Sequence, residues 1–421
     1  MAGDTVIRFS GFNGNQNALI SLPISKSLSN RVLILEKITG NQLGIKKFSE
    51  ARDTEILQNL LSQTEQTQEI DVEDAGTVAR FMLAYCATIP ERTFHLHGTY
   101  RMHQRPIAPL VNALRALGCE IQYLREPGFL PLTIKSPREL KSETELDTSL
   151  SSQFLSALLL ISPKIKTPFS IKLSSRVASL PYAKMTASII EQYGYTAHFS
   201  NVEVIVEKMG KAQEYDPEKL TEGDWSAAIY FLLINALGQG INITIPNISI
   251  NSLQGDSDVD KLLVPLGIEV FQNSEGISSR LIEKPNTCNL DLANNPDLAQ
   301  PIITYMVAKK ITGSITGLHT LGHKETDRLK ALEVELSKIG AIIRTDSGSL
   351  SILSYSGQPE TSNYTLETYN DHRMAMSFFL LQLVNPNIGI RNPEVVGKSF
   401  PSFWTKLEQI GFTFEHHNDA V

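Results

Sequence analysis

A helix that ends in glycine and turns into a short apolar strand recurs along this chain, and its period constrains the fold more than any other feature. Amphipathic patterns such as LVNALRALG and LKALEVELSKIG have the form expected of a helix with a glycine C-cap. The capping glycines are Gly118, Gly194, Gly267, Gly340 and Gly411, which lie about 71 to 76 residues apart. This spacing predicts a series of similar supersecondary units.

A second set of helical patterns alternates with the first and is apolar nearly all round, which is typical of buried helices. Its members are SLSNRVLILEKI, TVARFMLAYCATI, SQFLSALLLI, SAAIYFLLINALG, LAQPIITYMVAKK and HRMAMSFFLLQLV. We therefore expect six repeats, each with a core helix, a surface helix and strands between them. In the first repeat TEILQNLLSQ supplies a surface helix, but no glycine and strand follow before Asp74. The first repeat is expected to be truncated.

Six such units over 421 residues predict an α/β protein of two similar three-repeat domains. The polar stretch KMGKAQEYDPEKL indicates a boundary near Leu220 to Gly223. We expect one domain at residues 20–221 and a second at residues 1–19 and 222–421. A strand at Thr5 to Ser10 can pair with either half, and the pattern does not decide whether the sheets or the core helices lie outside.

Composition excludes several classes of function. A net charge of -7 and singly dispersed cations argue against a nucleic-acid-binding protein. No apolar run reaches the roughly 18 residues of a membrane span, and the first ten residues do not form an export leader. Cys86, Cys119 and Cys288 form no CxxC pair, and their odd number suits a reducing compartment. We expect a cytoplasmic monomer without a membrane partner that binds small anions.

Basic residues stand where helices are expected to begin, which is the unfavourable end of the helix dipole for a cation. A cation there destabilises the helix by about 0.3–1 kcal/mol unless an anion lies beside it. Arg328 and Arg373 open two such helices, Lys26 and Arg31 a third, and Arg105 precedes a fourth. One such start alone is most simply a solvated surface turn. Four in one chain favour a shared site for an anionic ligand.

Polar groups at three helix starts fit the same kind of site. Residues 25–31 combine three hydroxyls with two cations, which suits phosphate, although a serine N-cap explains them about as well. Gly76 would let a ligand approach the backbone, but a plain turn would place glycine there too. Ser151, Ser152 and Gln153 supply more hydrogen-bonding groups than one helix cap needs, which is a weak indication of binding.

Two carboxylates near these cations could divide proton donation and acceptance between them. Asp297 heads a core helix and Glu325 lies between Lys324 and Arg328, although a first-turn acid and a capping residue also explain them. His372 is more readily an orienting residue than a catalyst. No HExxH, CxxC pair, GxxxxGK[ST] or GxGxxG occurs, so we expect neither a metal nor a cofactor.

A series of motifs resembles, in order, the family of 5-enolpyruvylshikimate-3-phosphate synthases. They are PISKSLSNR, DAGT, RMHQRPI, LSSQFLSALLL, LPY, EGDWSAA, NSLQGD, NPD, HKETDR, YNDHRMAM and GKSFPSFW. The resemblance spans nearly the whole chain and implies two domains of three βαβαββ units, an inside-out α/β barrel, that close over the substrates. It also implies transfer of the enolpyruvyl group of phosphoenolpyruvate to the 5-hydroxyl of shikimate 3-phosphate, without a cofactor.

The resemblance assigns residues to the two substrates by motif. Shikimate 3-phosphate would contact Lys26, Ser27, Arg31, Ser151, Ser152, Gln153, Ser179, Tyr182, Asp297, Thr320 and Lys324, mostly in the first domain. Phosphoenolpyruvate would contact Lys26, Gly76, Arg105, Gln153, Arg328, Arg373 and Lys398. Asp297 resembles the base that takes the 5-hydroxyl proton, and Glu325 the acid that protonates the methylene carbon. Lys26 would be a third catalytic residue.

The chain departs from the family pattern in a few places. The residues are Ile24, Asp74, Phe81, Leu180 and Thr320, where Gly, Asn, Pro, Lys and Asn are common. Asp74 places a negative charge beside an expected anion site. Because the acid, the base and the main cation clamp remain, we expect activity. Gly76 resembles the residue whose small size admits glyphosate to the phosphoenolpyruvate site, so sensitivity to glyphosate is expected.

Two alternatives remain open at this point. A sister family that transfers enolpyruvyl to UDP-N-acetylglucosamine resembles this chain in its repeats but relies on a loop cysteine. Here Cys119 follows the capping Gly118 and Cys86 lies inside a core helix, so neither resembles that nucleophile. A non-catalytic anion-binding protein on the same scaffold is the second alternative, and it would leave Asp297 or Glu325 without a role.

Overall fold

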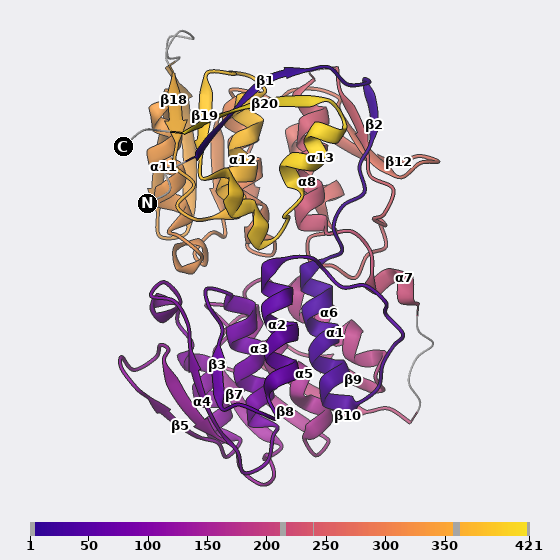
Figure 1. Cartoon of the computed structure of the whole chain (residues 1–421), viewed down its shortest axis with the longest axis vertical. Helices are drawn as coiled ribbons and strands as arrows, with labels where there is room; N and C mark the ends of the chain where they lie inside the picture. The colour runs from indigo at the N-terminus through magenta and orange to yellow at the C-terminus, as the bar shows by residue number, and fades with distance from the viewer. Residues whose placement is uncertain (1–4, 211–215, 239, 357–362, 419–421) are drawn as a thin grey trace. The chain divides into compact units, whose positions relative to one another are not determined.

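The computed structural model describes residues 5–210, 216–238, 240–356 and 363–418. The chain divides into two compact units, which Figure 1 draws with the sequence coloured from indigo to yellow. Unit 1 comprises Met1–Pro23, Glu222–Ser252 and Asp256–Val421, and unit 2 comprises Ile24–Thr221 and Leu253–Gly255. Residues 211–215 of the polar stretch predicted before the boundary lie outside the described residues.

Unit 2 packs two four-stranded sheets against helices. Its helices are α1 (Lys26–Thr39), α2 (Arg52–Gln63), α3 (Gly76–Ala87), α4 (Ala108–Ala116), α5 (Ser152–Ile161), α6 (Leu180–Glu191) and α7 (Pro217–Leu220), with 3-10 turns η1 (Met102–Gln104) and η2 (Ser162–Lys164). Its strands are β3 (Glu69–Asp71), β4 (Thr93–His97), β5 (Glu120–Tyr123), β6 (Leu132–Lys135), β7 (Glu143–Leu146), β8 (Phe169–Leu173), β9 (Tyr195–Phe199) and β10 (Glu203–Lys208). The strand orders are β3-β4-β6-β5 and β7-β8-β10-β9.

Unit 1 repeats this arrangement. Its helices are α8 (Trp225–Leu237), α9 (Val259–Leu263), α10 (Ala299–Ala308), α11 (Arg328–Lys338), α12 (His372–Gln382) and α13 (Phe403–Gln409), with 3-10 turns η3 (Val264–Leu266), η4 (Pro296–Leu298), η5 (Leu321–His323) and η6 (Pro393–Lys398). Its strands are β1 (Thr5–Phe12), β2 (Asn17–Leu19), β11 (Asn242–Thr244), β12 (Ile268–Gln272), β13 (Ile277–Leu281), β14 (Leu290–Asp291), β15 (Gly313–Thr316), β16 (Ala341–Asp346), β17 (Ser349–Tyr355), β18 (Tyr364–Leu366), β19 (Ile388–Arg391) and β20 (Phe412–Asn418).

The predicted βαβαββ repeat is confirmed by the order of strands within the sheets. In β3-β4-β6-β5, β7-β8-β10-β9 and β14-β15-β17-β16 the first pair is parallel and the later pairs are antiparallel. The sheet β18-β19-β1-β20 has the same form, with the N-terminal strand β1 in its third place. Strand β2 pairs with β11, and a bridge between Ile245 and Ile277 joins them to β12 and β13.

The first repeat is truncated, as predicted, because α1 and α2 have no sheet of their own within the described residues. One detail of the prediction was wrong. A short strand, β3, does lie before Asp74, but it pairs with β4 and therefore belongs to the second repeat. Three residues of alternating burial carry too little hydrophobic signal to be recognised as a strand from sequence.

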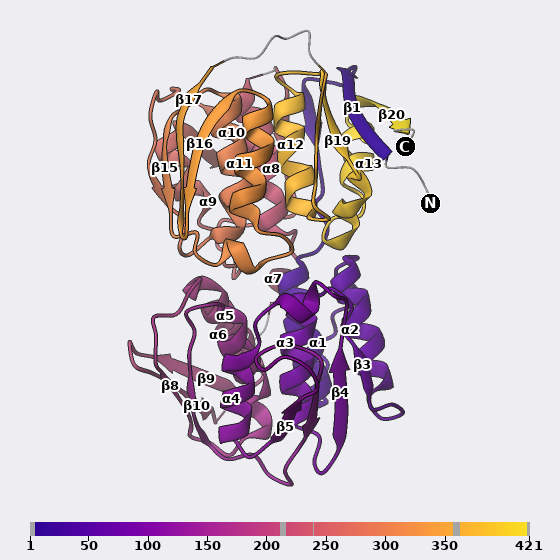
Figure 2. The same ribbon diagram turned by 90° about the vertical axis from the view of Figure 1, so that its left-hand side faces the viewer.

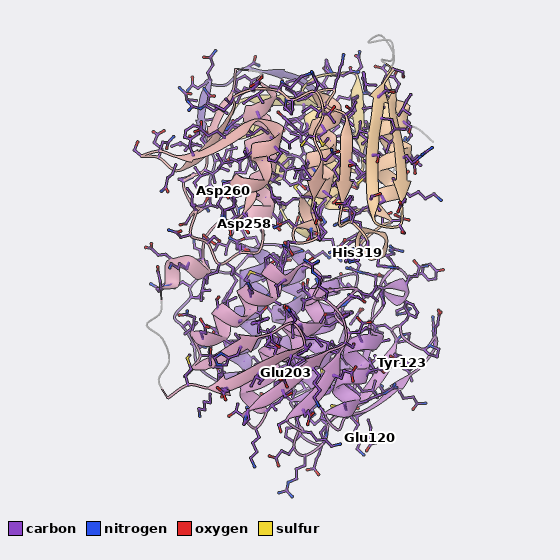
Figure 3. All side chains as sticks on the ribbon, turned by 180° about the vertical axis from the view of Figure 1, so that it is seen from behind. Glu120, Tyr123, Glu203, Asp258, Asp260 and His319 are labelled. Carbon is purple, nitrogen blue, oxygen red and sulfur yellow. The ribbon has the colours of Figure 1, made fainter. Side chains whose placement is uncertain are left out.

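Core helices lie inside each unit and sheets lie outside, which decides between the two packings that the sequence left open. Every residue of α8 except Ser226 is buried, and α8, α10 and α12 pack side by side in unit 1 (Figure 2). In unit 2, β5 buries Ile121 and exposes Glu120. Figure 3 shows Glu120, Tyr123 and Glu203 on the sheets of this unit, Glu120 and Tyr123 on β5 and Glu203 on β10.

The predicted capping glycines are confirmed by their backbone angles. Gly118, Gly194, Gly267, Gly340 and Gly411 have φ of +108°, +87°, +72°, +89° and +106°. Positive φ at the end of a helix favours glycine because it has no Cβ. The helix expected before Gly267, over the sequence DVDKLLVPLG, is not continuous in the structure, since it is divided into α9 and η3. Pro265 explains the break, because proline lacks the N–H that would continue an α-helix.

Candidate active site

Seven charged side chains gather where the helices of unit 1 begin, and we call them the unit 1 cluster. They are Asp297, Lys324, Glu325, Arg328, Asp371, Arg373 and Lys398. Asp297 lies in η4 just before α10, while α11 and α12 supply residues from their first turns. Because α10 packs against both α11 and α12, residues distant in sequence come together.

Arg328 is the centre of the unit 1 cluster and is 1% exposed. Its Nε lies 2.7 Å from Asp371 Oδ2, and its Nη1 lies 3.0 Å from Asp297 Oδ1. Its Nη2 lies 2.9 Å from Glu325 Oε2. Burial alone would lower the pKa of Arg328, but the three carboxylates outweigh it and raise that pKa above its usual range. The anion expected beside this helix start is therefore supplied, in this structure, by carboxylates of the protein itself.

Asp297 is surrounded by three cations. Its carboxylate lies 3.3 Å from Lys324 Nζ and 3.0 Å from Arg328 Nη1. Arg373 Nη2 lies 3.2 Å from its other oxygen. Burial would raise the pKa of Asp297, but these cations outweigh burial and hold the pKa well below its usual range. The side chain is 21% exposed, so this carboxylate remains accessible at one side.

Glu325, Thr320 and His372 lie around the same cluster. Glu325 Oε1 is 4.0 Å from Lys398 Nζ, in addition to its bond with Arg328. Thr320 precedes η5, and its buried hydroxyl has no hydrogen-bond partner among the described residues. The His372 ring is 3% exposed and its Nδ1 lies 4.0 Å from Asp371. This burial agrees with an orienting role for His372.

Asp371 was not predicted as a site residue, although it holds two members of the unit 1 cluster. Its side chain is fully buried, bonds Arg328 and accepts from the backbone N–H of Arg373 at 2.9 Å as the N-cap of α12. The available signal was an aspartate at the expected N-cap of the helix that Arg373 opens. An N-cap role already explains an aspartate at this position, and nothing in the sequence predicts its ion pair with Arg328.

Arg31 of α1 is a buried cation with neutral partners. It is 2% exposed, and its Nε donates to Thr186 Oγ1 at 2.7 Å. Its other donors reach Ser156 Oγ and the backbone oxygens of Ser27 and Tyr182, and its guanidinium lies 5.3 Å from the centre of the Phe81 ring. No described carboxylate pairs with it, and burial lowers the pKa of Arg31 to about 10. The departure at Phe81 thus becomes a packing surface for this cation.

Lys26 opens α1 and pairs with a carboxylate that the sequence analysis missed. Its Nζ lies 3.0 Å from Asp53 Oδ2, and the side chains are 17% and 4% exposed. Asp53 comes from α2, the surface helix of the truncated first repeat. The pairing depends on the packing of α1 against α2, so no local pattern could indicate it. Ser27, next to Lys26, is partly buried.

Gly76 and Arg105 lie in direct contact. A Cβ at Gly76 would stand 2.5–2.6 Å from the guanidinium atoms of Arg105, so the Arg105 side chain could not keep this position beside a larger residue. Arg105 follows η1 and is 6% exposed. Gln153 reaches the same helix start from α5, because its Nε2 donates to Thr77 Oγ1 at 3.0 Å. Two predicted anion contacts and one predicted amide therefore meet at the start of α3.

The remaining predicted residues of unit 2 lie at the starts of α5 and α6. Ser151 caps α5, with its hydroxyl accepting from Gln153 N at 3.2 Å, and Ser152 is 6% exposed. Ser179 precedes α6 with φ of +52° and is 8% exposed. Tyr182 lies in the first turn of α6, where its carbonyl accepts from Thr186 Oγ1. Both helices pack against α1, which carries Arg31.

Asp74 stands close to a cation, Arg52 of α2. Arg52 forms an ion pair with Glu73, and Asp74 and Asp53 add to the negative potential around it. The pKa of Arg52 is raised, first by its hydrogen bond with Glu73 and in smaller part by these aspartates. Arg52 of α2 is therefore a cation near enough to Asp74 to feel its charge, although its ion pair is with Glu73.

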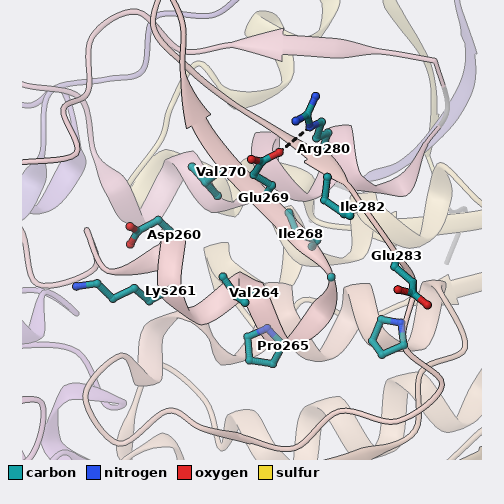
Figure 4. Close-up of a pocket in the computed structure, with 12 residues that line it drawn as sticks. Asp260, Lys261, Val264, Pro265, Ile268, Glu269, Val270, Arg280, Ile282 and Glu283 are labelled. Carbon is teal, nitrogen blue, oxygen red and sulfur yellow. Dashed lines mark hydrogen bonds and ion pairs between the residues drawn. The ribbon is translucent and has the colours of Figure 1, made fainter.

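A surface hollow of unit 1 lies away from the predicted site residues. A hollow of about 860 Å³ lies on unit 1 between α9, η3, β12 and β13, and no predicted site residue lines it (Figure 4). No group of His, Cys, Asp and Glu side chains in the described ranges has the arrangement of a metal site. None of the described helices has the length and apolar character needed to cross a membrane.

Comparison with known proteins places these clusters in context. The family model described as EPSP synthase (3-phosphoshikimate 1-carboxyvinyltransferase) matches residues 56–407. The 3-phosphoshikimate 1-carboxyvinyltransferase of Bacteroides fragilis (strain YCH46) is 37% identical over 402 residues, covering 94% of this chain and 95% of that one. The enzyme of the same name from Shewanella woodyi is 34% identical, covering 92% and 95%.

Solved structures show the same fold. An EPSP synthase from Acinetobacter baumannii aligns with a TM-score of 0.71 at 19% identity, covering 98% of this chain and 100% of that chain. The enolpyruvyl transferase NikO from Streptomyces tendae aligns with a TM-score of 0.67 at 13% identity, covering 99% and 100%. At these identities the likeness concerns the fold alone.

Proposed function

We propose how the two units perform one reaction, from the premise that this chain belongs to the EPSP synthase (3-phosphoshikimate 1-carboxyvinyltransferase) family. The chain transfers the enolpyruvyl group of phosphoenolpyruvate to the 5-hydroxyl of shikimate 3-phosphate and releases phosphate. This is a step of the shikimate pathway, which supplies aromatic amino acids. The observation that carries the assignment of residues is the unit 1 cluster, where Asp297 and Glu325 share the guanidinium of Arg328.

Shikimate 3-phosphate is bound mainly by unit 2 in this proposal. Its contacts are Lys26, Ser27, Arg31, Ser151, Ser152, Gln153, Ser179 and Tyr182, together with Asp297, Thr320 and Lys324 of unit 1. Arg31 supports this assignment because its buried guanidinium donates to neutral oxygens and pairs with no carboxylate in the described ranges, so a bound phosphate or carboxylate would lower its energy. The Thr320 hydroxyl, which has no hydrogen-bond partner in the part of the chain that the structure describes, is likewise suited to a substrate oxygen.

Phosphoenolpyruvate is bound by a cation clamp. Its contacts are Arg328, Arg373 and Lys398 of unit 1, with Lys26, Gly76, Arg105 and Gln153 of unit 2. Arginine pairs with carboxylate or phosphate through two parallel hydrogen bonds, whereas lysine acts as a compact charge. The contact between Arg105 and Gly76 supports the assignment, because the backbone at the start of α3 and the guanidinium offer donors side by side.

Asp297 acts as the base, and the bound substrates raise its pKa. In the free protein three cations hold its pKa low, which makes it a weak base. Phosphoenolpyruvate held by Arg328 and Arg373 and shikimate 3-phosphate held by Lys324 offset the charge of these cations and raise the pKa of Asp297 towards the useful range. Asp297 then accepts the proton of the 5-hydroxyl as this oxygen attacks the central carbon of phosphoenolpyruvate.

Glu325 acts as the acid in the same step. It donates a proton to the methylene carbon, and the product of attack is a tetrahedral intermediate with a methyl group. The Glu325 carboxylate then takes back one methyl proton, and phosphate leaves with the proton held by Asp297. This restores the double bond and the starting protonation states of both residues. Cations of the unit 1 cluster stabilise the charge that develops on phosphate, and Lys26 contributes to the same effect.

The decisive experiment is phosphate release from phosphoenolpyruvate by the purified protein. We expect release with shikimate 3-phosphate and none with UDP-N-acetylglucosamine or without an acceptor. Absence of release with shikimate 3-phosphate would overturn the proposal, and binding without release would favour a non-catalytic protein. We further propose that the chain acts in the cytoplasm as a monomer, which cell fractionation and light scattering would test.

A further inference from the structure

Two consecutive residues between β18 and α12 adopt a backbone conformation that L-amino acids avoid. Tyr369 has φ of +53° and Asn370 has φ of +54°. A bulky residue in this region is an outlier, and such strain persists only where the surroundings impose it. The turn leads directly into Asp371, the N-cap of α12 and the partner of Arg328. Contacts outside the turn must therefore hold it in place.

Glu335 of α11 provides these contacts. Its side chain is fully buried, and its Oε1 accepts from Tyr369 Oη at 2.7 Å. Its Oε2 accepts from the backbone N–H of Glu367 at 2.9 Å and from Lys338 Nζ at 2.6 Å. Two of its three donors, Glu367 and Tyr369, thus come from the connection between β18 and α12. A buried carboxylate satisfied in this way is costly to disturb.

Tyr369 depends on this hydrogen bond for its position. The residue is 39% exposed, so packing alone does not fix it. Burial and the neighbouring carboxylate of Glu335 raise the pKa of Tyr369, so its hydroxyl keeps the proton that it donates. The bond therefore persists across the neutral pH range.

The same face of α11 holds the segment at a second point. Arg328 and Glu335 are seven residues apart, which is about two helical turns and places them on one face. Glu335 binds Tyr369 and Glu367, while Arg328 binds Asp371. The connection from Glu367 to Asp371 is therefore held by α11 at two places, at Glu335 and at Arg328. These two contacts together set the position of Asp371 relative to Arg328.

We propose that the hydrogen bond between Glu335 and Tyr369 positions the phosphoenolpyruvate-binding arginines. It holds the turn that places Asp371, and Asp371 orients the Arg328 guanidinium and the first turn of α12 with Arg373. Glu335 and Tyr369 are positioning residues that act without touching substrate. The inference rests on the proposed role of Arg328 and Arg373, because paired hydrogen bonds to an anion need a fixed guanidinium plane.

Steady-state kinetics of Tyr369→Phe tests this inference. We expect the KM for phosphoenolpyruvate to rise roughly five- to twenty-fold, while kcat and the KM for shikimate 3-phosphate change by less than about three-fold. Tyr364→Phe is the matched control, because Tyr364 lies in β18 and its hydroxyl makes no hydrogen bond within the described part of the chain; all its constants should stay unchanged.

Glu335→Gln provides a second variant that keeps the volume and one acceptor oxygen. It should raise the same KM, and the double variant should raise it by less than the product of the two single factors, since both substitutions affect the bond between positions 335 and 369. Any loss beyond that of Tyr369→Phe would come from the bonds of Glu335 to Glu367 and Lys338. A fall in melting temperature with both KM values unchanged would show a merely structural role and overturn the inference. Equal rises in the two KM values would overturn it as well.

Arg373→Gln separates failure of this inference from failure of the proposed function. If Arg373→Gln raises the KM for phosphoenolpyruvate and Tyr369→Phe does not, the positioning role alone is wrong. If Arg373→Gln leaves that KM unchanged, the assigned phosphoenolpyruvate site is wrong and the positioning role falls with it.

Discussion

The unit 1 cluster and Arg31 of unit 2 show two ways of burying cations at helix starts. Arg328 has three carboxylates within 3.0 Å, and its charge is compensated before any ligand arrives. Arg31 is equally buried but is held by hydroxyls, backbone oxygens and the ring of Phe81. The pKa of Arg328 is raised, whereas that of Arg31 is lowered to about 10.

This difference indicates that the two regions have different roles, proton transfer in the unit 1 cluster and substrate binding at Arg31. A cluster that contains its own carboxylates can exchange protons, and a bound anion changes their pKa values. A buried cation without a carboxylate is instead stabilised by an anionic ligand. We therefore expect substitutions of the cluster carboxylates Asp297 and Glu325 to reduce turnover most, and substitutions at Arg31 to reduce substrate affinity most.

The largest expected effect comes from removing the proposed base. Asp297→Asn keeps the shape and the hydrogen-bonding capacity of the side chain but cannot accept the 5-hydroxyl proton. We expect kcat to fall by about 10²–10⁴-fold, in line with general base catalysis. Steady-state phosphate release measures this effect, and Asp291→Asn, an exposed strand-end aspartate of the same unit, is the control. A loss below ten-fold would contradict the role of Asp297.

Replacing Arg31 should separate function from stability. For Arg31→Met we expect the KM for shikimate 3-phosphate to rise by about 10–100-fold, because a charge-assisted contact is lost. Stability should stay equal or increase, because burying an uncompensated charge opposes folding.

Thermal melting and kinetics together test this prediction. Arg115→Met is the control, since Arg115 also lies over an aromatic ring, Tyr123, at 5.1 Å but is no site residue. A large loss of stability in Arg31→Met with an unchanged KM would show that Arg31 supports the fold only.

A smaller effect is expected where space, not charge, is changed. Gly76→Ala would place a Cβ 2.5–2.6 Å from the guanidinium of Arg105, so this side chain must move. We expect the KM for phosphoenolpyruvate to rise roughly five- to ten-fold and glyphosate inhibition to weaken by a similar or larger factor. Inhibition curves for both proteins measure this, and identical curves would show that Arg105 does not contribute to the anion site.

The smallest effect concerns stability in acid. Because the folded-state pKa of Asp297 is lowered, its carboxylate contributes stability above the unfolded pKa of about 3.9. That contribution is lost as pH falls towards the folded value, at up to about 1.4 kcal/mol per pH unit. Urea unfolding should therefore show a constant difference between wild type and Asp297→Asn from pH 6 to 8, which shrinks below about pH 4. A difference that changes between pH 6 and 8 would contradict this assignment.

Much of the fold could be predicted because its signals are local and periodic. Apolar helices mark all six repeats and capping glycines mark the last five, and the structure confirms both. Strand β3 and the interruption of α9 at Pro265 were missed because short elements carry little periodic signal.

The partners of the site residues could not be predicted, because they depend on packing. Asp53 meets Lys26 across 27 positions, and Asp371 meets Arg328 across 43. In each pair the cation was recognisable from its place at a helix start, whereas its carboxylate looked like an ordinary helix residue. The sequence thus indicated where anions are expected to bind, and the structure shows which carboxylates lie beside those cations.

The most direct test of these separate roles uses Asp297→Asn. Calorimetry measures its affinity for shikimate 3-phosphate, and this affinity is compared with its turnover. Our account predicts a dissociation constant within about three-fold of wild type, although turnover falls by about 10²-fold or more. Loss of binding in proportion to loss of turnover would contradict the account, because Asp297 would then hold the substrate and not its proton.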